Sequence, residues 1–271
     1  MKAQIDARIA KPVAHSGSAM DTKYYGLLTF VLLVSLSAIS QTHAPGEVFL
    51  KDATISENRG TVHVVTNSPR PLAQVLDALQ RKYGWVVNYE DPQYVATADY
   101  VEDPGTERSR IPAGRTFSVE FPAGTAEEKV LRLVVDAYNK SSNPGHFEIR
   151  QPADGSFDIV GTEAHDNNGK MLEQQVPLDL SVTLPSEERP VNDTVDRICS
   201  EVTKQLHYDF NLGISPRSFL LRSTAKIGGT NKSAREFLTQ SLSATHQRLY
   251  WRLLFDPNTK TYLLNLHAVH S

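Results

Sequence analysis

One sequence pattern occurs twice in this chain of 271 residues, and it constrains the fold more than any other feature. Residues 70–91 read RPLAQVLDALQRKYGWVVNYED: a proline-bounded start, a helix with an apolar stripe, a glycine and a short apolar strand. Residues 189–210, RPVNDTVDRICSEVTKQLHYDF, follow much the same order. A strand–helix–strand pattern that returns within one chain predicts an internal duplication.

The first unit is expected over residues 61–163 and contains two helices. Gly84 is placed to end the first helix in the left-handed conformation. Thr125 and Glu128 form a capping-box sequence at the start of the second helix. Strands are expected at residues 62–65, 85–90, 116–121, 146–150 and 157–161. The helical stripes are Leu72, Val75, Leu76 and Leu79, then Val130, Leu131, Val134, Val135 and Tyr138.

The second unit is expected over residues 176–271 with the same order of elements. Ser233 and Glu236 form the capping-box sequence of its second helix. Strands are expected at residues 177–184, 207–210, 218–227, 248–255 and 261–267. The stripes are Val195, Ile198, Cys199, Val202 and Leu206, then Ala234, Phe237, Leu238 and Leu242.

Together these patterns predict an α+β fold of two tandem units, each β-α-β followed by β-α-β-β, with two helices packed against small sheets. Residues 45–60 and the polar residues 164–175 are expected to be linkers. Residues 61–163 and 176–269 should superpose, each with two helices and the same strand order, and one continuous sheet across both would contradict the duplication. Residues 91–115 lack a helical stripe and predict either a solvated loop or a loop that carries contacts.

Residues 1–44 are expected to lie outside both units. Residues 24–39 carry no charge, and small residues precede Ala44, as in a secretory signal that is cleaved after that alanine. A retained membrane anchor is the alternative, because residues 24–44 reach the length of about 20 residues that crosses a bilayer. Met20 offers an alternative start to Met1. In both cases the remainder is expected to be periplasmic, or anchored in the inner membrane and facing the periplasm.

The charge of the exported part argues against nucleic-acid binding. Residues 1–44 hold four of the 28 basic and two of the 31 acidic residues, which leaves residues 45–271 with a formal net charge of −5. Nucleic-acid binding requires a concentrated basic face, and no run of residues supplies one. The single cysteine, Cys199, excludes an internal disulfide.

A family resemblance lies in three segments of the first unit: the strand at residues 62–65, the helix and strand PLAQVLDALQRKYGWVVNYE, and FSVEFPAGTAEEKVLRLVVDAY with its closing hairpin. Through these segments the first unit resembles the short N-terminal domain of secretins and TonB-dependent transducers. The resemblance covers nearly all of residues 61–163 and, more weakly, residues 176–269. It implies two β-α-β halves around two helices, and a periplasmic contact module rather than an enzyme. No plug, barrel or secretin core follows the units, and the unit is doubled. The resemblance therefore implies adaptor work and not transport.

No motif for catalysis, a cofactor or a metal stands out. Residues 226–233, KIGGTNKS, lack the glycines of a phosphate-binding loop at Lys226 and Asn231, and predict a glycine turn before a helix. Cys199 lies on an apolar stripe, which favours a buried core residue over a nucleophile paired with His207. His267, His270 and the pair His165-Asp166 have no metal-ligand spacing.

The last hairpin, residues 248–267, is expected to be the contact site. Both faces of its first strand are partly apolar, which indicates a covered sheet, either against the other unit or against a partner. We expect its second strand to be a free sheet edge that accepts a partner strand, with Trp251, Tyr262 and Leu264 as partner-binding residues.

The sequence therefore predicts an exported, non-catalytic adaptor module of the cell envelope whose partner is an envelope protein. An enzyme with catalytic residues dispersed along the chain is the alternative. A convergent polar cleft in the structure would favour that enzyme, and an exposed apolar edge would favour the adaptor. The sequence implies no cofactor and no small-molecule ligand.

Overall fold

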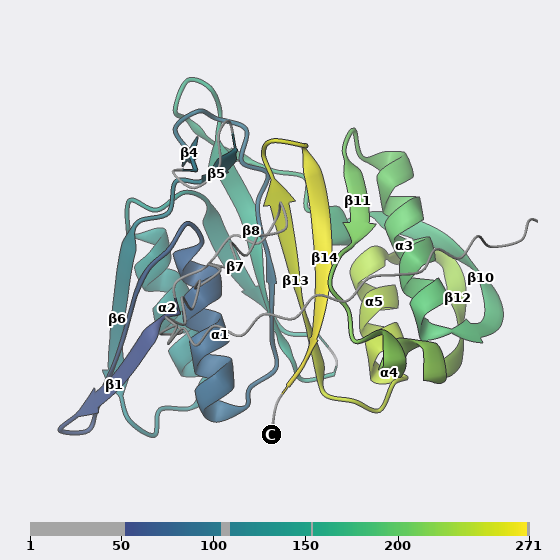
Figure 1. The fold of residues 1–271 in the computed structure, drawn as a ribbon, viewed down its shortest axis with the longest axis horizontal. Helices are drawn as coiled ribbons and strands as arrows, with labels where there is room; N and C mark the ends of the chain where they lie inside the picture. The colour runs from purple at the N-terminus through teal and green to yellow at the C-terminus, as the bar shows by residue number, and fades with distance from the viewer. Residues whose placement is uncertain (1–51, 104–108, 153, 270–271) are drawn as a thin grey trace, which may run out of the picture. The chain divides into compact units, whose positions relative to one another are not determined.

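The computed structural model describes residues 52–103, 109–152 and 154–269, and Figure 1 traces these as ribbons. The signal or anchor predicted in residues 1–44 lies outside these residues. Within the described ranges, no helix combines the length and the apolar character that crossing a membrane requires.

The first unit contains α1 (Pro71–Tyr83) and α2 (Glu127–Asn139). Gly84 ends α1 with φ 71°, as predicted. The predicted cap at Thr125 is wrong, because α2 has Ala126 as its N-cap and the Thr125 hydroxyl donates instead to the carbonyl of Pro122 at 2.6 Å. The strands are β1 (Thr54–Asn58), β2 (Thr61–Asn67), β3 (Val87–Glu90), β4 (Tyr100–Glu102), β5 (Arg110–Pro112), β6 (Thr116–Pro122), β7 (His146–Arg150), β8 (Phe157–His165) and β9 (Met171–Glu173).

The second unit contains α3 (Val191–Gln205) and α5 (Ala234–Ser243). The predicted cap of α5 is confirmed: the Ser233 hydroxyl accepts the backbone N–H of Glu236 at 3.1 Å. The strand predicted at residues 218–227 is wrong in its first half, which forms the short helix α4 (Arg217–Arg222). The other elements are the 3-10 helix η1 (Pro177–Asp179) and the strands β10 (Ser181–Pro190), β11 (Asp209–Leu212), β12 (Thr224–Ser233), β13 (Leu249–Asp256) and β14 (Thr261–Ala268).

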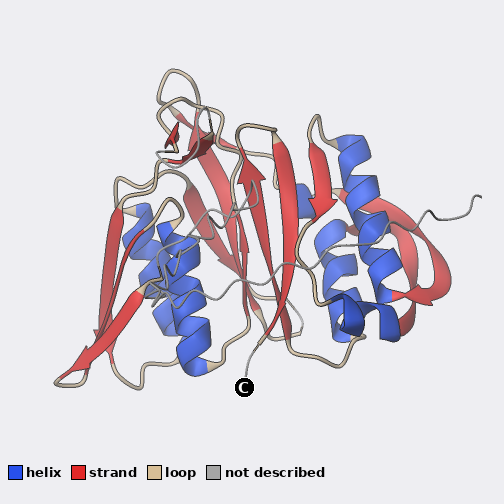
Figure 2. Cartoon of the chain, in the orientation of Figure 1, coloured by secondary structure: helices blue, strands red, loops and turns tan. Residues whose placement is uncertain are grey.

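The two units share one central sheet with the order β11-β14-β13-β3-β8-β7, to which β9 adds beside β8. Smaller sheets, β1-β2-β6 and β10-β12, lie at the two outer sides, and β4 and β5 form a separate hairpin. Figures 1 and 2 show five layers: a small sheet, α1 and α2, the central sheet, α3 and α5, and the other small sheet. The chain is thus an α+β protein, as predicted from its sequence.

Helices α1 and α2 cover one face of the central sheet, and α3 and α5 cover the other. The structure therefore has two hydrophobic cores. Alternate residues of β13 point to different cores, because side chains alternate along a strand. Leu253 packs into the second core and Leu254 against the first. The first core includes Leu72, Leu76, Val87, Val130, Val134, Phe147 and Ile159, and the second includes Val195, Ile198, Phe210, Phe237, Leu253, Tyr262 and Leu264.

The predicted duplication is contradicted by the criterion set for it, because β13 of the second unit pairs in parallel with β3 of the first and one sheet runs through both. The order and pairing of elements nevertheless repeat. In the first unit β3 pairs in parallel with β8, which pairs antiparallel with β7; in the second β11 pairs in parallel with β14, which pairs antiparallel with β13. Likewise β2 pairs with β6 and β10 with β12, both antiparallel. The two units are joined through one sheet edge from each.

The predicted linkers and the insertion are more structured than expected. Residues 45–60 contain β1, and residues 164–175 contain the end of β8 and all of β9. The insertion at 91–115 is not simply a solvated loop. Tyr94 and Ala96 are buried, and the buried Asp99 carboxylate accepts the backbone N–H of His165 at 3.0 Å. The insertion is therefore held against β8.

Candidate functional site

The three residues predicted to bind a partner lie in the core. Trp251, Tyr262 and Leu264 are each at most 1% exposed. The predicted free edge is also wrong, because β14 lies between β13 and β11 and pairs with both. The hairpin belongs to a sheet that the first unit covers, as one of the two alternatives predicted, and it is not an edge that waits for a partner. These side chains therefore offer no surface to a partner.

The predicted core role of Cys199 is confirmed. Its side chain is buried, and burial raises the pKa of the Cys199 thiol to about 12, so the thiolate that a nucleophile requires is strongly disfavoured. His207 is exposed beyond the end of α3.

The remaining candidates from the sequence stand apart from one another. His165 lies 2.7 Å from Asp99 through its Nδ1, Asp166 accepts backbone N–H groups of a turn, and His267 stacks on Tyr250. His270 lies outside the described residues. Among the residues that are described, no three His, Cys, Asp or Glu side chains gather as a metal site would require. Residues 226–232, expected to form a glycine turn, lie within β12.

Buried ion pairs lie at the joint between the two units. Arg235 on α5, whose side chain is 11% exposed, reaches into the first unit and binds three carboxylates. Its nitrogens lie 2.5 Å from Glu90, 3.0 Å from Asp158 and 3.0 Å from Asp179. Burial raises the pKa of the carboxyls of Glu90 and Asp158, and Arg235 opposes that rise. The arginine thus balances two buried acids that belong to the other unit.

Two further arginines cross the joint. Arg252 on β13 lies 2.5 Å from Asp77 of α1 and donates to the carbonyl of Val87 at 2.5 Å. Arg70, at the start of α1, lies 2.6 Å from the carboxylate of Asp91 and donates to the carbonyl of Phe255 at 2.6 Å. These bonds add side-chain contacts to the backbone pairing of β3 with β13 and so help to join the two units.

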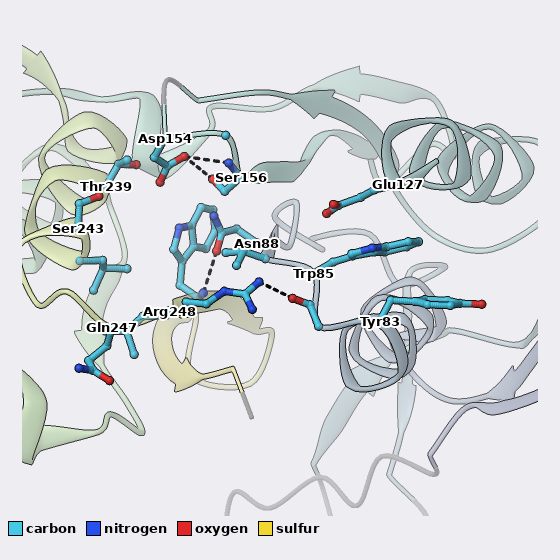
Figure 3. A pocket seen from close by; sticks show the side chains of 16 residues that line it. Tyr83, Trp85, Asn88, Glu127, Asp154, Ser156, Thr239, Ser243, Gln247 and Arg248 are labelled. Atoms are coloured by element: carbon cyan, nitrogen blue, oxygen red, sulfur yellow. Dashed lines mark hydrogen bonds between the residues drawn. The ribbon is translucent and has the colours of Figure 1, made fainter. Parts of the chain in front are cut away.

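A cleft of about 550 Å³ opens where the two units meet. In Figure 3, Trp85 lies between Tyr83 and Glu127, and Arg248 donates to the carbonyl of Gly84. The rings of Tyr83 and Trp85 stack with centroids 4.7 Å apart. The lining residues are Tyr83, Gly84, Trp85, Val86, Asn88, Glu127, Asp154, Gly155, Ser156, Thr239, Leu242, Ser243, Gln247, Arg248, Leu249 and Trp251.

Polar, charged and aromatic side chains line this cleft. Partial burial raises the pKa of Glu127, and Arg248 opposes that shift. The lining carries hydroxyl and carboxylate side chains, and no histidine, cysteine or lysine is among the described residues that form it. The Ser156 hydroxyl donates to the carboxylate of Asp154 at 2.7 Å. These groups can hold a polar ligand through hydrogen bonds.

The free edges of the central sheet are β7 and β11, each of which pairs with one neighbour in the described chain. Side chains cap both edges. The amide of Asn139 accepts the N–H of Phe147 on β7 at 3.0 Å and donates to its carbonyl at 2.8 Å. The hydroxyl of Thr203 does the same for Phe210 on β11, at 3.1 and 3.2 Å. Neither cap is predictable from the sequence, because an isolated Asn or Thr at a helix end forms no recognisable pattern.

Comparisons with protein-family models, curated proteins and solved structures gave no match to this chain. The resemblance to the short domain of secretins and TonB-dependent transducers therefore enters the functional argument as a hypothesis.

Proposed function

We propose that this chain is a non-catalytic protein-interaction module of the cell envelope, an adaptor that is exported through residues 24–44 and contacts envelope proteins. The observation that carries the proposal is where apolar side chains are exposed. Half of the exposed large apolar side chains in the described chain lie in the two connections that link the halves of each unit, residues 91–115 and 213–223. Exposed apolar groups rimmed by polar residues are typical of protein-contact surfaces.

The connection in the second unit is the more apolar of the two. Ile214 is 67% exposed, Leu221 on α4 is 54% exposed, and Phe219 is also exposed. Arg217 and Arg222 stand at the two ends of α4. A short helix with exposed Leu and Phe between arginines favours a partner surface that offers an apolar pocket and acidic groups.

The connection in the first unit carries Val95 and Val101, both more than 40% exposed. Because β3 and β11 run antiparallel to one another in the shared sheet, their connections emerge at opposite ends of it. Figure 1 shows β4 and β5 at one end and α4 at the other. A scaffold with a contact surface at each end can hold two partners at once, which supports an adaptor role.

The test is site-specific photo-crosslinking in the envelope of the native host, with the crosslinking residue at Leu221 or Val101 of the full chain. Val65 on β2 is the matched control, because it is 44% exposed and apolar but lies outside both connections. We expect each connection to capture a defined envelope protein, and Leu221→Asp to abolish capture at the α4 end without loss of folding. Equal capture from Val65, or none from either connection, would contradict the proposal.

A further inference from the structure

The internal joint shows how this unit accepts a neighbouring strand. Ile149 pairs with Ile159 in the first unit as Leu253 pairs with Leu264 in the second. Phe210 pairs with Tyr262 as Val87 pairs with Phe157. By this register β7 corresponds to β13 and β11 to β3. The joint uses β13 and β3, which leaves the corresponding strands β7 and β11 as the two free edges.

The cap on β7 occupies the place of an added strand. In the joint, the Asn88 side chain of β3 accepts the backbone N–H of Trp251 at 2.9 Å. Phe147 is the counterpart of Trp251, and its N–H is bound by the amide of Asn139 instead. Asn139 thus makes, from within the unit, the hydrogen bond that an incoming strand makes at the joint.

The free edge β11 carries the matching group. Asn211 stands where β3 has Asn88, and it is exposed. Leu212 stands where β3 has Tyr89, the residue that pairs with Arg252 of β13. Thr203 caps Phe210, which corresponds to Val87 of β3. In the joint the carbonyl of Val87 accepts a hydrogen bond from the Arg252 side chain. The cap therefore leaves free Leu212, the counterpart of the paired residue Tyr89.

Each of the two edges has an uncovered surface beside it. A groove of about 550 Å³ runs between α2 and β7, in the position that corresponds to the space between α5 and β13. On β14, beside β11, Leu263 is 38% exposed on the face that α3 and α5 do not cover. In the joint, α5 covers the corresponding face of β3 and β8 through Arg235. In a second copy, α2 is the helix that would cover Leu263.

We propose that the β7 edge of one copy accepts the β11 edge of a second copy in parallel, with Asn139 as a displaceable cap. The contact is head-to-tail, so repetition generates an open chain or a ring. It uses the strand edges and none of the exposed apolar side chains of the two connections, so it is independent of the proposed function and either can fail alone.

Electrostatics make this contact weaker than the internal joint. Glu148 stands on β7 where β13 has Arg252. When α1 and α3 are aligned by the Arg-Pro sequence at the start of each, Asp77 corresponds to Asp196. Asp77 is the residue that binds Arg252 in the joint. The contact would bring Glu148 toward Asp196 of the second copy, two like charges where the joint has an ion pair. Glu148→Arg should convert that repulsion into the ion pair of the joint.

The experiment is sedimentation velocity of the full chain over a concentration series. Each hydrogen bond that Asn139 makes shifts an equilibrium by about 2- to 13-fold, so Asn139→Ala should tighten self-association by about 10- to 100-fold. Glu148→Arg in the same background should tighten it further, whereas Glu120→Arg, an exposed acid on the outer strand β6, should not. Adding Leu212→Pro, which removes a donor from the β11 edge, should return the protein to monomers.

A covalent readout settles the geometry even where a proline variant does not fold. Glu148→Cys and Leu212→Cys are equivalent to the paired residues Arg252 and Tyr89 of the joint. We expect a disulfide only when the two cysteine variants, both carrying Asn139→Ala, are mixed. Three results would overturn the proposal. The first is a protein with Asn139→Ala and Glu148→Arg that stays monomeric at every concentration. The others are self-association that survives Leu212→Pro in a folded protein, and disulfides that form within each cysteine variant alone.

Discussion

Replacing Arg235 by alanine tests whether the joint is held by buried charge. The change leaves Glu90 and Asp158, whose side chains are at most 1% exposed, without their counter-ion. Removing one partner of a buried ion pair costs about 3 to 5 kcal/mol, because the remaining charge is buried and uncompensated. The third contact, to Asp179, adds little, since that carboxylate is 38% exposed. We therefore expect Arg235→Ala to lower the free energy of unfolding by about 3 to 5 kcal/mol.

The pH dependence of this loss has a definite sign. Without Arg235, burial acts unopposed by the arginine and the folded-state pKa of both carboxyls rises further above the unfolded values. A raised carboxyl pKa means that the folded state binds the proton more tightly, so stability falls as pH rises through the raised pKa. The difference between wild type and Arg235→Ala should be larger at pH about 8 than at pH about 5. Neutral Glu90→Gln with Asp158→Asn should recover part of the loss.

The assay is urea denaturation followed by tryptophan emission, because Trp85 and Trp251 both line the cleft at the joint. Arg150→Ala is the matched control. Arg150 also binds Asp179, but its side chain is 33% exposed, so its loss should cost less than about 1 kcal/mol. If Arg235→Ala costs no more than Arg150→Ala, the acids of the joint are not held as charged groups and the reasoning fails.

Three further predictions use single side chains. Cys199→Ser should destabilise the fold by about 1 to 3 kcal/mol, since it buries a hydroxyl in an apolar stripe, and native Cys199 should react with a thiol reagent only after unfolding. Burial, with Arg252 as a lesser cause, lowers the pKa of His267, so its contribution to stability is present above pH about 6.5 and is lost as pH falls; His267→Asn should flatten that slope in urea titrations. Ser233→Ala should cost about 0.5 to 2 kcal/mol in thermal or urea unfolding, whereas Thr125→Ala, at a residue that does not cap its helix, should cost less.

The helices were predictable from the sequence because each repeats apolar residues at a spacing that only a helix places on one face. The exception is α4, where FLL inside a six-residue helix gives a short apolar run that fits a strand equally well. The missed strands β1, β4, β5 and β9 are short or largely exposed, so they carry little apolar alternation. Local pattern thus identified the elements that bury a face and failed for those that do not.

The continuous sheet was not predictable for a different reason. Arg252 stands on the second face of β13, is 4% exposed and binds Asp77 of the first unit. Glu90 and Asp158 are charged residues of short strands, and both are buried against Arg235 of the second unit. A face that is buried through ion pairs has the same composition as one that faces water. The same ambiguity misplaced the free edge, since β14 has no sequence feature that distinguishes an edge strand from a paired one.

Two corresponding arginines have different partners, because the joint pairs an edge in only one of the two units. Arg70 and Arg189 both precede the proline at the start of a helix, and both are buried. Arg70 lies on the side of its unit that meets β13, and it binds the carbonyl of Phe255 across the joint. Arg189 lies in the unit whose corresponding edge is free, and its guanidinium donates within that unit, to Thr194 and to the carbonyl of Ile227. Corresponding positions therefore serve assembly in one unit and local packing in the other, because only one of the two corresponding edges is paired.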